Sequence, residues 1–381
     1  MKSFFSFFRN IDWLLFGSVF LIVCAGLVTM NSFVPAQAGI EKSAFFDHQI
    51  IWLGISLIVF FLASHVDWRF LQNTRILIVL YSIIVFLLLL LFVLGKVSKG
   101  AQSWFSFGLF SFQPVDFSKL IIILILAKYF SRRHVEIADI RHIIVSGVYI
   151  FVVAVLVLLQ PDFGSVIIIF LLWLGMVLIS GISKKHLLLV FTVALVSFLF
   201  LWGLVFHPYQ KERILNFIHP LTNIRGSGYN AYQSTIAVGS GELLGKGVGQ
   251  GTQSRLQYLP EYQTDFIFAA FAEEWGFIGV LLLFILFSIM FTRLLRIASR
   301  AGSNFEMLFG LGLAILFMIH TGINIGMNIG LLPVTGNTLP FMSYGGSHLV
   351  AEFLGLGMMM GMSKYNRAVH KEKAHGEIVG M

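Results

Sequence analysis

The sequence predicts an all-α polytopic membrane protein, and three observations lead to this fold class. Hydrophobic residues make up 57% of the chain and charged residues only 12%, whereas a water-soluble domain carries roughly 25% charged residues. Apolar runs of roughly 20 residues, enough to cross a bilayer as a helix, recur along the chain. The polar stretches between them are too short for a separate soluble domain, so we predict a single domain over 1–381.

About ten transmembrane helices explain the apolar runs. We place them at 12–33, 48–66, 76–94, 113–130, 142–159, 163–180, 187–206, 266–292, 306–330 and 346–363. Most of the 26 Lys and Arg residues then lie in segments that are cytoplasmic if the N-terminus is inside. By the positive-inside rule, both termini are predicted to be cytoplasmic, and the large loop between helices 7 and 8, about 207–264, to be extracytoplasmic. The same rule explains the net charge of +8, so nucleic acid is not expected as a partner.

Two outer segments have a distinctive composition. Segment 95–113 is rich in aromatic residues and is expected to dip into the membrane interface, where Trp104 would be stable. Loop 207–264 is longer than most connections, and such loops are usually functional or disordered. Its apolar patches at 236–238 and 243–244 predict short helices near the membrane.

A polar, glycine-rich stretch at 239–274 stands out in this apolar chain and ends where the eighth span begins. Its glycines do not match a nucleotide-binding loop, because the sequence has no GxxxxGK[ST] motif and no strand is predicted before them. We expect a tight outer loop whose backbone N–H groups could bind phosphate oxygens. Cys24 is the only cysteine, which excludes a CxxC metal site.

Asp265 is the strongest catalytic candidate in this stretch, and it has a structural alternative. It opens the eighth span, where an acidic residue can cap the helix or interact with its dipole. A second carboxylate, Glu261, lies four residues before it, and Lys246 and Arg255 lie in the same loop. A carboxylate in such surroundings is suited to general-base catalysis, so capping and catalysis both remain open.

Ionisable residues inside predicted spans are costly and often functional. Asp116 and Lys119 are three residues apart and share a helix face. They form either a structural ion pair or a pair in which Lys119 faces an anionic ligand or orients another acid. Asp162 is predicted to cap the helix that follows it. Of Glu273 and Glu274, at least one should point into the bundle, as a structural group or a ligand contact.

Four motifs give the chain a resemblance to a known family. They are SWFSFGLFSFQPVDFSKL (103–120), QPDFGSV (160–166), GSGYNAYQSTIAVGSGELLGKGVGQGTQSRLQYLPEYQTDFIFAAFAEE (226–274) and NIGMNIGLLPVTGNTLPFMSYGGS (324–347). With the ten-span layout, they make nearly the whole chain similar to the SEDS family of bacterial cell-wall proteins, which includes RodA and FtsW. GKGVGQGTQS ahead of LPE resembles RodA more than FtsW.

The resemblance implies an enzyme, a peptidoglycan glycosyltransferase that polymerises lipid II into glycan strands at the outer face of the bacterial cytoplasmic (inner) membrane. It also implies a role in cell elongation and shape maintenance. The implied partners are lipid II, the glycan linked to polyprenyl pyrophosphate, a class B penicillin-binding protein that cross-links the product, and other membrane proteins of the elongation complex.

The resemblance also assigns site residues. Asp265 matches the family's catalytic aspartate, and Asp116 and Lys119 match its Glu and Lys in QPSExxK. Glu261 matches the glutamate of LPE and is a supporting residue. Positive charge for the pyrophosphate leaving group is expected from Arg213, Lys246, Arg255 and Lys119, with or without a divalent cation such as Mg²⁺ or Mn²⁺. The residues expected to bind substrate are Trp104, Lys246, Arg255, Arg213, Gln253 and Ser343.

The sequence departs from the family pattern at several positions, none of which is Asp265. Asp116 stands where Glu is usual, which shortens the side chain by one methylene. Gln263 replaces a common His, which argues against a histidine base. The other departures are Ser103 in place of Arg, Asn337-Thr338 in place of Ile-Pro, and His348 in place of Ser.

In the expected mechanism, Asp265 removes the proton from a sugar hydroxyl of incoming lipid II as that oxygen attacks the anomeric carbon of the donor glycan. One direct displacement would invert the anomeric centre. A lipid II flippase or other transporter and a non-catalytic scaffold remain alternatives. A transporter should hold its polar groups near the midplane, whereas here they cluster at the outer surface, and a scaffold would not need Asp265.

Overall fold

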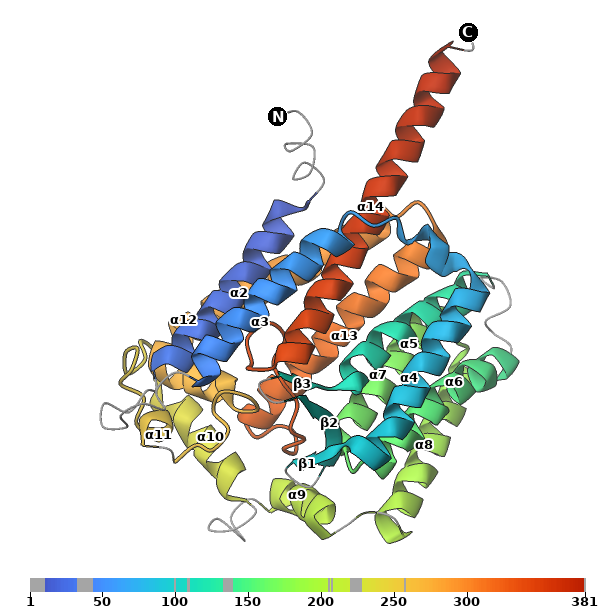
Figure 1. Cartoon of the computed structure of the whole chain (residues 1–381). Helices are drawn as coiled ribbons and strands as arrows, with labels where there is room; N and C mark the ends of the chain where they lie inside the picture. The colour runs from blue at the N-terminus through green and yellow to red at the C-terminus, as the bar shows by residue number, and fades with distance from the viewer. Residues whose placement is uncertain are drawn as a thin grey trace.

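The computed structural model describes residues 11–32, 44–98, 101–107, 110–132, 140–204, 206, 208–219, 228–256 and 258–379. Helices dominate these residues, as the composition predicts, and Figure 1 shows the long ones running roughly side by side as a bundle.

Ten long helices coincide with the ten predicted spans. They are α2 (Trp13–Ser32), α3 (Ala44–Ala63), α4 (Thr74–Leu94), α5 (Pro114–Ser131), α6 (Ile140–Leu159), α7 (Phe163–Ile179), α8 (Lys184–Leu204), α12 (Ile267–Ser299), α13 (Asn304–Asn328) and α14 (Gly346–Val379). Among the described residues, seven helices are long and apolar enough to cross a membrane, and α7 is a shorter apolar helix. α5 and α14 are not among the seven, and both carry buried charged side chains. The multi-pass helical fold is therefore confirmed.

α13 lies inside the bundle and fixes the position of its neighbours. It packs against α5, α7 and α12, while α14 packs mainly against α3. The approach is close at Gly312, where a side-chain carbon would lie 2.6 Å from Ile123 on α5 and 2.9 Å from Met176 on α7. Small residues allow helices to approach in this way. α8 lies at the edge of the bundle (Figure 1), and in that fully described helix only Val190 is buried.

The two ends of the bundle differ in character. The start of α2 and the far part of α14 lie at one end, and the short elements of the long loop lie at the other (Figure 1). At the first end, Arg293 near the end of α12 pairs with Asp12 just before α2. This arrangement fits the prediction that both termini lie on one side of the membrane and the long loop on the other.

The aromatic segment before α5 forms a small antiparallel sheet, which the sequence analysis did not predict. Its strands are β1 (Lys96–Ser98), β2 (Ala101–Phe107) and β3 (Phe110–Phe112), in the order β1-β2-β3. On β2, Ser103 and Phe105 are buried while Ser106 is exposed. Side chains of a strand alternate between its two faces, and this two-residue pattern explains why an aromatic-rich segment forms strands here.

The long loop contains α9 (Pro208–Ile218), α10 (Tyr229–Ser240) and the short α11 (Thr252–Arg255). The apolar patch at 236–238 lies in α10, as predicted. Leu243 and Leu244 instead lie in a turn and are 68% and 78% exposed, so the helix predicted there is wrong. A 3-10 helix, η1 (Trp68–Gln72), connects α3 and α4 at the opposite end.

The predicted topology can be tested by cysteine labelling in a Cys24→Ser background. Gln250 is exposed in the glycine-rich stretch, and Ser299 is exposed at the other end of the bundle, where α12 ends. An impermeant thiol reagent should label the Gln250→Cys variant in cells whose outer layers are permeabilised, and the Ser299→Cys variant only after the cytoplasmic membrane is opened. If only the Ser299→Cys variant is labelled in intact cells, the true topology is the reverse of the predicted one.

Candidate active site

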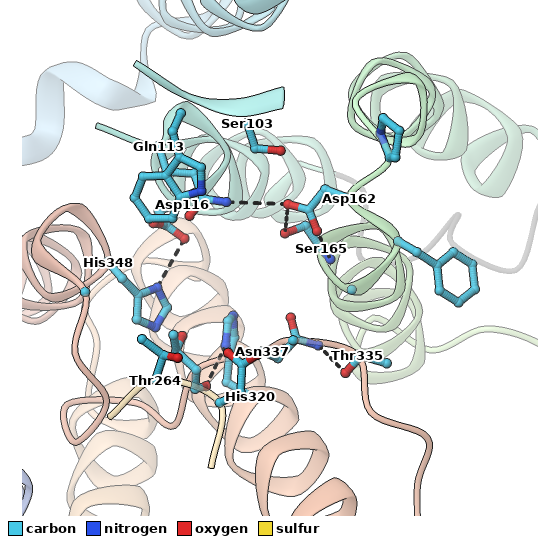
Figure 2. Close-up of a pocket in the computed structure, with 18 of the residues that line it drawn as sticks. Ser103, Gln113, Asp116, Asp162, Ser165, Thr264, His320, Thr335, Asn337 and His348 are labelled. Atoms are coloured by element: carbon cyan, nitrogen blue, oxygen red, sulfur yellow. Dashed lines mark hydrogen bonds and ion pairs between the residues drawn. The ribbon is translucent and has the colours of Figure 1, made fainter. Parts of the chain in front are cut away.

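A cavity of about 420 Å³ opens at the loop-bearing end of the bundle. It lies where the small sheet, α5, α7 and α9 meet the segment before α12 and the connection between α13 and α14. Figure 2 shows side chains from these elements pointing toward a common space. Many of the residues that line it are polar or charged although the protein is apolar, and polar groups that converge on one pocket are typical of a ligand site.

Five of the predicted site residues line this cavity. They are Trp104, Asp116, Lys119, Arg213 and Asp265. They come from β2, α5, α9 and the residues just before α12, so the fold brings together positions that are far apart in the sequence. The pocket therefore joins the candidate base to a buried ion pair, an aromatic ring and a guanidinium group.

The backbone around Asp265 is held by several hydrogen bonds. Asn324 and Asn328, one turn apart on α13, both donate through their side-chain amides to the carbonyl oxygen of Asp265 at 3.0 Å. The preceding carbonyl, that of Thr264, accepts a hydrogen bond of 2.7 Å from the hydroxyl of Ser343. These contacts fix where the Asp265 side chain begins.

Asp265 is not the N-cap residue of the eighth span. α12 begins at Ile267, and its N-cap is Phe266, whose side chain makes no capping hydrogen bond. The carboxylate of Asp265 instead faces Gly336, where a side-chain carbon would lie 3.6 Å from Oδ2. Gly336 has a φ of +77°, a conformation that favours glycine. The N-cap position of α12 thus belongs to Phe266, and the catalytic role of Asp265 stays a prediction.

Asp116 is buried at the inner wall of the pocket with three polar partners. Its Oδ1 lies 3.2 Å from Lys119 Nζ and 3.1 Å from His348 Nδ1. Its Oδ2 accepts from the Ser347 hydroxyl at 3.3 Å. Both members of the Asp116–Lys119 pair are 4% exposed. The predicted pair thus exists, and it is connected to α14 through His348 (Figure 2).

Asp162 caps α7, as predicted. Its carboxylate accepts hydrogen bonds from the backbone N–H of Ser165 at 3.1 Å and from the Ser165 hydroxyl at 2.8 Å. It also accepts a long hydrogen bond of 3.4 Å from the side-chain amide of Gln113. Because these three residues line the pocket, the cap also fixes part of its wall (Figure 2).

The other predicted site residues lie outside the pocket lining. Lys246 pairs with the buried Glu273 at 2.7 Å, and the backbone N–H of Gln253 donates to the same carboxylate at 3.0 Å. Arg255 is exposed at the end of α11. Glu261 accepts from the Thr264 hydroxyl at 3.0 Å. Ser343 acts on the backbone before Asp265, as described above. Their roles toward substrate stay predictions.

The glycine-rich segment packs its backbone against α12. The N–H groups of Lys246 and Gly247 donate to the carbonyls of Glu273 and Glu274, both at 3.0 Å. Gly249 N–H donates to the Glu274 carboxylate at 2.6 Å. These three N–H groups are the kind that we expected to bind phosphate, and the protein itself already occupies them. The two glutamates therefore hold this segment against α12, which is the structural one of the two roles left open above.

Sequence analysis gave no site role to the two pocket histidines, His320 on α13 and His348 on α14, although it noted His348 as a departure from the family pattern. His320 is an ionisable residue inside an apolar span, which was a usable signal. Among the described residues, its Nε2 and the hydroxyl of Ser103 have no hydrogen-bond partner, although both residues are 2% exposed. Buried polar atoms are nearly always paired with protein, water or ligand, so both atoms indicate where a ligand could bind.

Comparisons with known proteins agree with this arrangement. A family model described as a cell cycle protein, of the FtsW/RodA/SpoVE type, matches residues 12–368. The peptidoglycan glycosyltransferase MrdB of Escherichia coli K12 is 34% identical over 352 residues, which cover 92% of this chain and 94% of MrdB. The stage V sporulation protein E of Bacillus subtilis is 37% identical, with 93% and 98% covered.

Solved structures show the same fold. A chain from a peptidoglycan synthase complex, described as coordinating polymerization and crosslinking, has a TM-score of 0.79 at 29% identity, covering 94% of this chain and 99% of that one. The crystal structure of the rod shape determining protein RodA of Thermus thermophilus has a TM-score of 0.69 at 28% identity, covering 94% and 98%. The chain therefore belongs to the FtsW/RodA/SpoVE family, the SEDS family of multi-pass membrane proteins.

Proposed function

We propose that this protein is a peptidoglycan glycosyltransferase that polymerises lipid II at the outer face of the bacterial cytoplasmic membrane, with Asp265 as general base. The observation that carries the proposal is the position of Asp265 in a polar pocket shared with the Asp116–Lys119 pair, Trp104 and Arg213. The peptidoglycan glycosyltransferase activity in the name of MrdB supports it.

Asp265 accepts the proton of the acceptor hydroxyl during attack on the anomeric carbon. A sugar hydroxyl is a very weak acid, so proton removal and attack occur together, and a positioned base typically contributes about 100- to 10,000-fold. The hydrogen bonds from Asn324 and Asn328 keep the base at one place in the pocket. Gly336 leaves room beside the carboxylate, where a larger side chain would compete with the sugar.

The leaving pyrophosphate is stabilised by positive charge at the pocket. Arg213 and Lys96 line it from α9 and β1, and Lys119 lies at its inner wall. Lys246 and Arg255 lie outside the pocket lining, in the glycine-rich segment, and are further candidates for binding the pyrophosphate. A Mg²⁺ or Mn²⁺ ion remains part of the proposal. Among the described residues, no group of three or more His, Cys, Asp or Glu side chains could hold such an ion, so the pyrophosphate oxygens would supply most of its ligands.

The sugar is oriented by the wall of the small sheet. Trp104 offers an aromatic face, and the unpaired hydroxyl of Ser103 lies next to it in sequence on the same strand. Aromatic faces and a few well-placed polar groups are what concave ligand sites use for orientation. This wall lies on β2, whereas the base precedes α12, so the substrate is held between two separate elements.

We further propose that the protein acts in cell elongation together with a class B penicillin-binding protein. The GKGVGQGTQS segment favours a RodA-like role, and the likeness to the rod shape determining protein RodA of Thermus thermophilus supports it. The likeness to a chain from a peptidoglycan synthase complex supports a cross-linking partner. Other membrane proteins of the elongation complex would join the same assembly.

Asp265→Asn should reduce polymerisation of lipid II by about 100-fold or more, because the amide cannot accept a proton. The melting temperature should stay unchanged, since the backbone contacts of residue 265 are retained. Asp47→Asn, at an exposed acid in the first turn of α3, is the matched control and should keep full activity. Glycan products are measured with Mg²⁺, Mn²⁺ or EDTA, which also tests the divalent ion. Near-normal activity of Asp265→Asn would move the assignment to Glu261 or to the flippase alternative.

Lys119→Met should abolish polymerisation and lower the melting temperature, because it leaves the buried Asp116 carboxylate without its cation. The double variant Asp116→Asn with Lys119→Met removes both charges and should regain stability but not activity. Melting temperature and polymerisation are measured on the same preparation. If the double variant regains both, the pair serves the fold alone.

The partner prediction is tested by purification from the native membrane in mild detergent. Mass spectrometry should find a class B penicillin-binding protein in a constant ratio to this chain. A division-specific partner in place of an elongation one would correct the proposed cellular role, and consistent recovery of the chain alone would contradict the complex.

A further inference from the structure

A buried row of charged side chains leads inward from the pocket. It begins with Lys119 and Asp116 on α5 and continues to His348 on α14, whose Nδ1 lies 3.1 Å from Asp116 Oδ1. The other ring nitrogen, Nε2, lies 3.0 Å from Glu352 Oε1, one turn further along α14. This last contact is a close approach of nitrogen and oxygen and not a well-aligned hydrogen bond. His348 thus contacts two buried carboxylates, one with each ring nitrogen.

The row continues into the connection that holds Asp265. The second oxygen of Glu352 accepts a hydrogen bond of 2.9 Å from the backbone N–H of Phe341. Phe341 has a φ of +61°, which is unfavourable for a large side chain and persists only where the surroundings enforce it. Two residues later, Ser343 donates to the carbonyl of Thr264, next to Asp265.

A second contact fastens the same connection. The backbone N–H of Tyr344 donates to the carbonyl of Gln263 at 2.8 Å. Together with the Ser343 hydrogen bond, it ties the connection between α13 and α14 to the residues before α12. A shift of the Phe341 backbone would therefore move the segment that carries Asp265.

The charges along the row explain why a histidine is suited to this place. Isolated carboxylates are very costly in an apolar interior unless they are paired. Lys119 contacts Asp116 from one side. The other carboxylate, Glu352 on α14, is contacted by His348. An imidazole between the two carboxylates can donate to both. The ring of His320 lies beside it, with centroids 5.1 Å apart, so His320 is the other titratable group that faces His348.

We infer that His348 is a positioning residue of the active site, which joins the Asp116–Lys119 pair to the Asp265 segment through Glu352 and Phe341. The inference rests on the proposed function, because it assigns His348 a role in placing the proposed base. His348 need not touch the substrate to act in this way. Its loss should displace both the Asp116 carboxylate at the pocket wall and the connection that Phe341 belongs to.

Two amide variants separate the two contacts. The side-chain nitrogen of Asn lies roughly where Nδ1 of His lies, and that of Gln roughly where Nε2 lies. His348→Asn therefore retains the Asp116 contact, and His348→Gln retains the Glu352 contact. His348→Ala removes both. His142, which is buried on α6 with its Nδ1 2.9 Å from the Tyr129 hydroxyl, offers the control variant His142→Ala outside the pocket.

The experiment measures kcat and KM for lipid II polymerisation and the melting temperature of the full chain, with its partner if one is needed for activity. His348→Ala should lower kcat by about tenfold or more with KM within about twofold, because a displacement of about 1 Å can cost up to about 100-fold. His348→Asn and His348→Gln should both lose kcat, and His142→Ala should keep it.

Several outcomes would overturn the inference. A normal kcat in His348→Ala means that the residue serves stability alone, even if the melting temperature falls. A normal kcat in either amide variant means that one contact suffices and the link does not matter. If His348→Ala does not fold, the two amide variants decide. Asp265→Asn is assayed alongside. If it is inactive while His348→Ala is normal, only this inference fails. If it is active, the proposed base and this inference fail together.

Discussion

The arrangement of the pocket depends on how α13 holds the backbone just before α12. Asn324 and Asn328 both donate to the carbonyl of Asp265, and Asn328 also accepts from the N–H of Ala269 at 3.2 Å. Residues four apart lie on one helix face. A single buried face of α13 therefore contacts the chain just before and just after Ile267, where α12 begins. The hydroxyl of Ser234 on α10 donates to the carbonyl of Asn328 at 2.9 Å and extends this connection to the long loop.

Several charged side chains inside the described part of the bundle are held by specific partners. Asp116 is shared by Lys119 and His348, and Glu273 is surrounded by donors from Lys246 and from the segment around α11. Uncompensated charge in an apolar interior is so costly that each carboxylate fixes the chain segments around it. Glu273 therefore helps to hold the outer segments together. Asp265, in contrast, lines the pocket.

The spans could be predicted because a membrane requires long apolar helices, and hydropathy alone reveals them. Asp265 was a candidate from its position before the eighth span, and Asp116 and Lys119 from their spacing in an apolar run, whereas the family motifs assigned their roles. The strands before α5 were missed because seven residues of alternating pattern are a weak signal among aromatic residues. The glycine segment was assigned to phosphate because nothing local reveals a packing partner. That partner, α12, follows later in the chain and accepts the N–H groups of Lys246 and Gly247. The link from His348 to Phe341 also depends on contacts of this kind, so it could not be predicted from the sequence.

Two of the buried pocket atoms that lack a hydrogen-bond partner matter for antibiotic design. Among the described residues, the Ser103 hydroxyl and His320 Nε2 have no partner in the protein. His320 Nδ1 lies 3.4 Å from the carbonyl of Thr338, and if it donates there, Nε2 is left as an acceptor. A small molecule that offers a donor to Nε2 and an acceptor to Ser103 would gain two hydrogen bonds without breaking any within the protein. Both atoms are shielded from bulk water, so they lose little hydration when such a compound binds. Less of the energy of the new hydrogen bonds is then offset by the cost of desolvation.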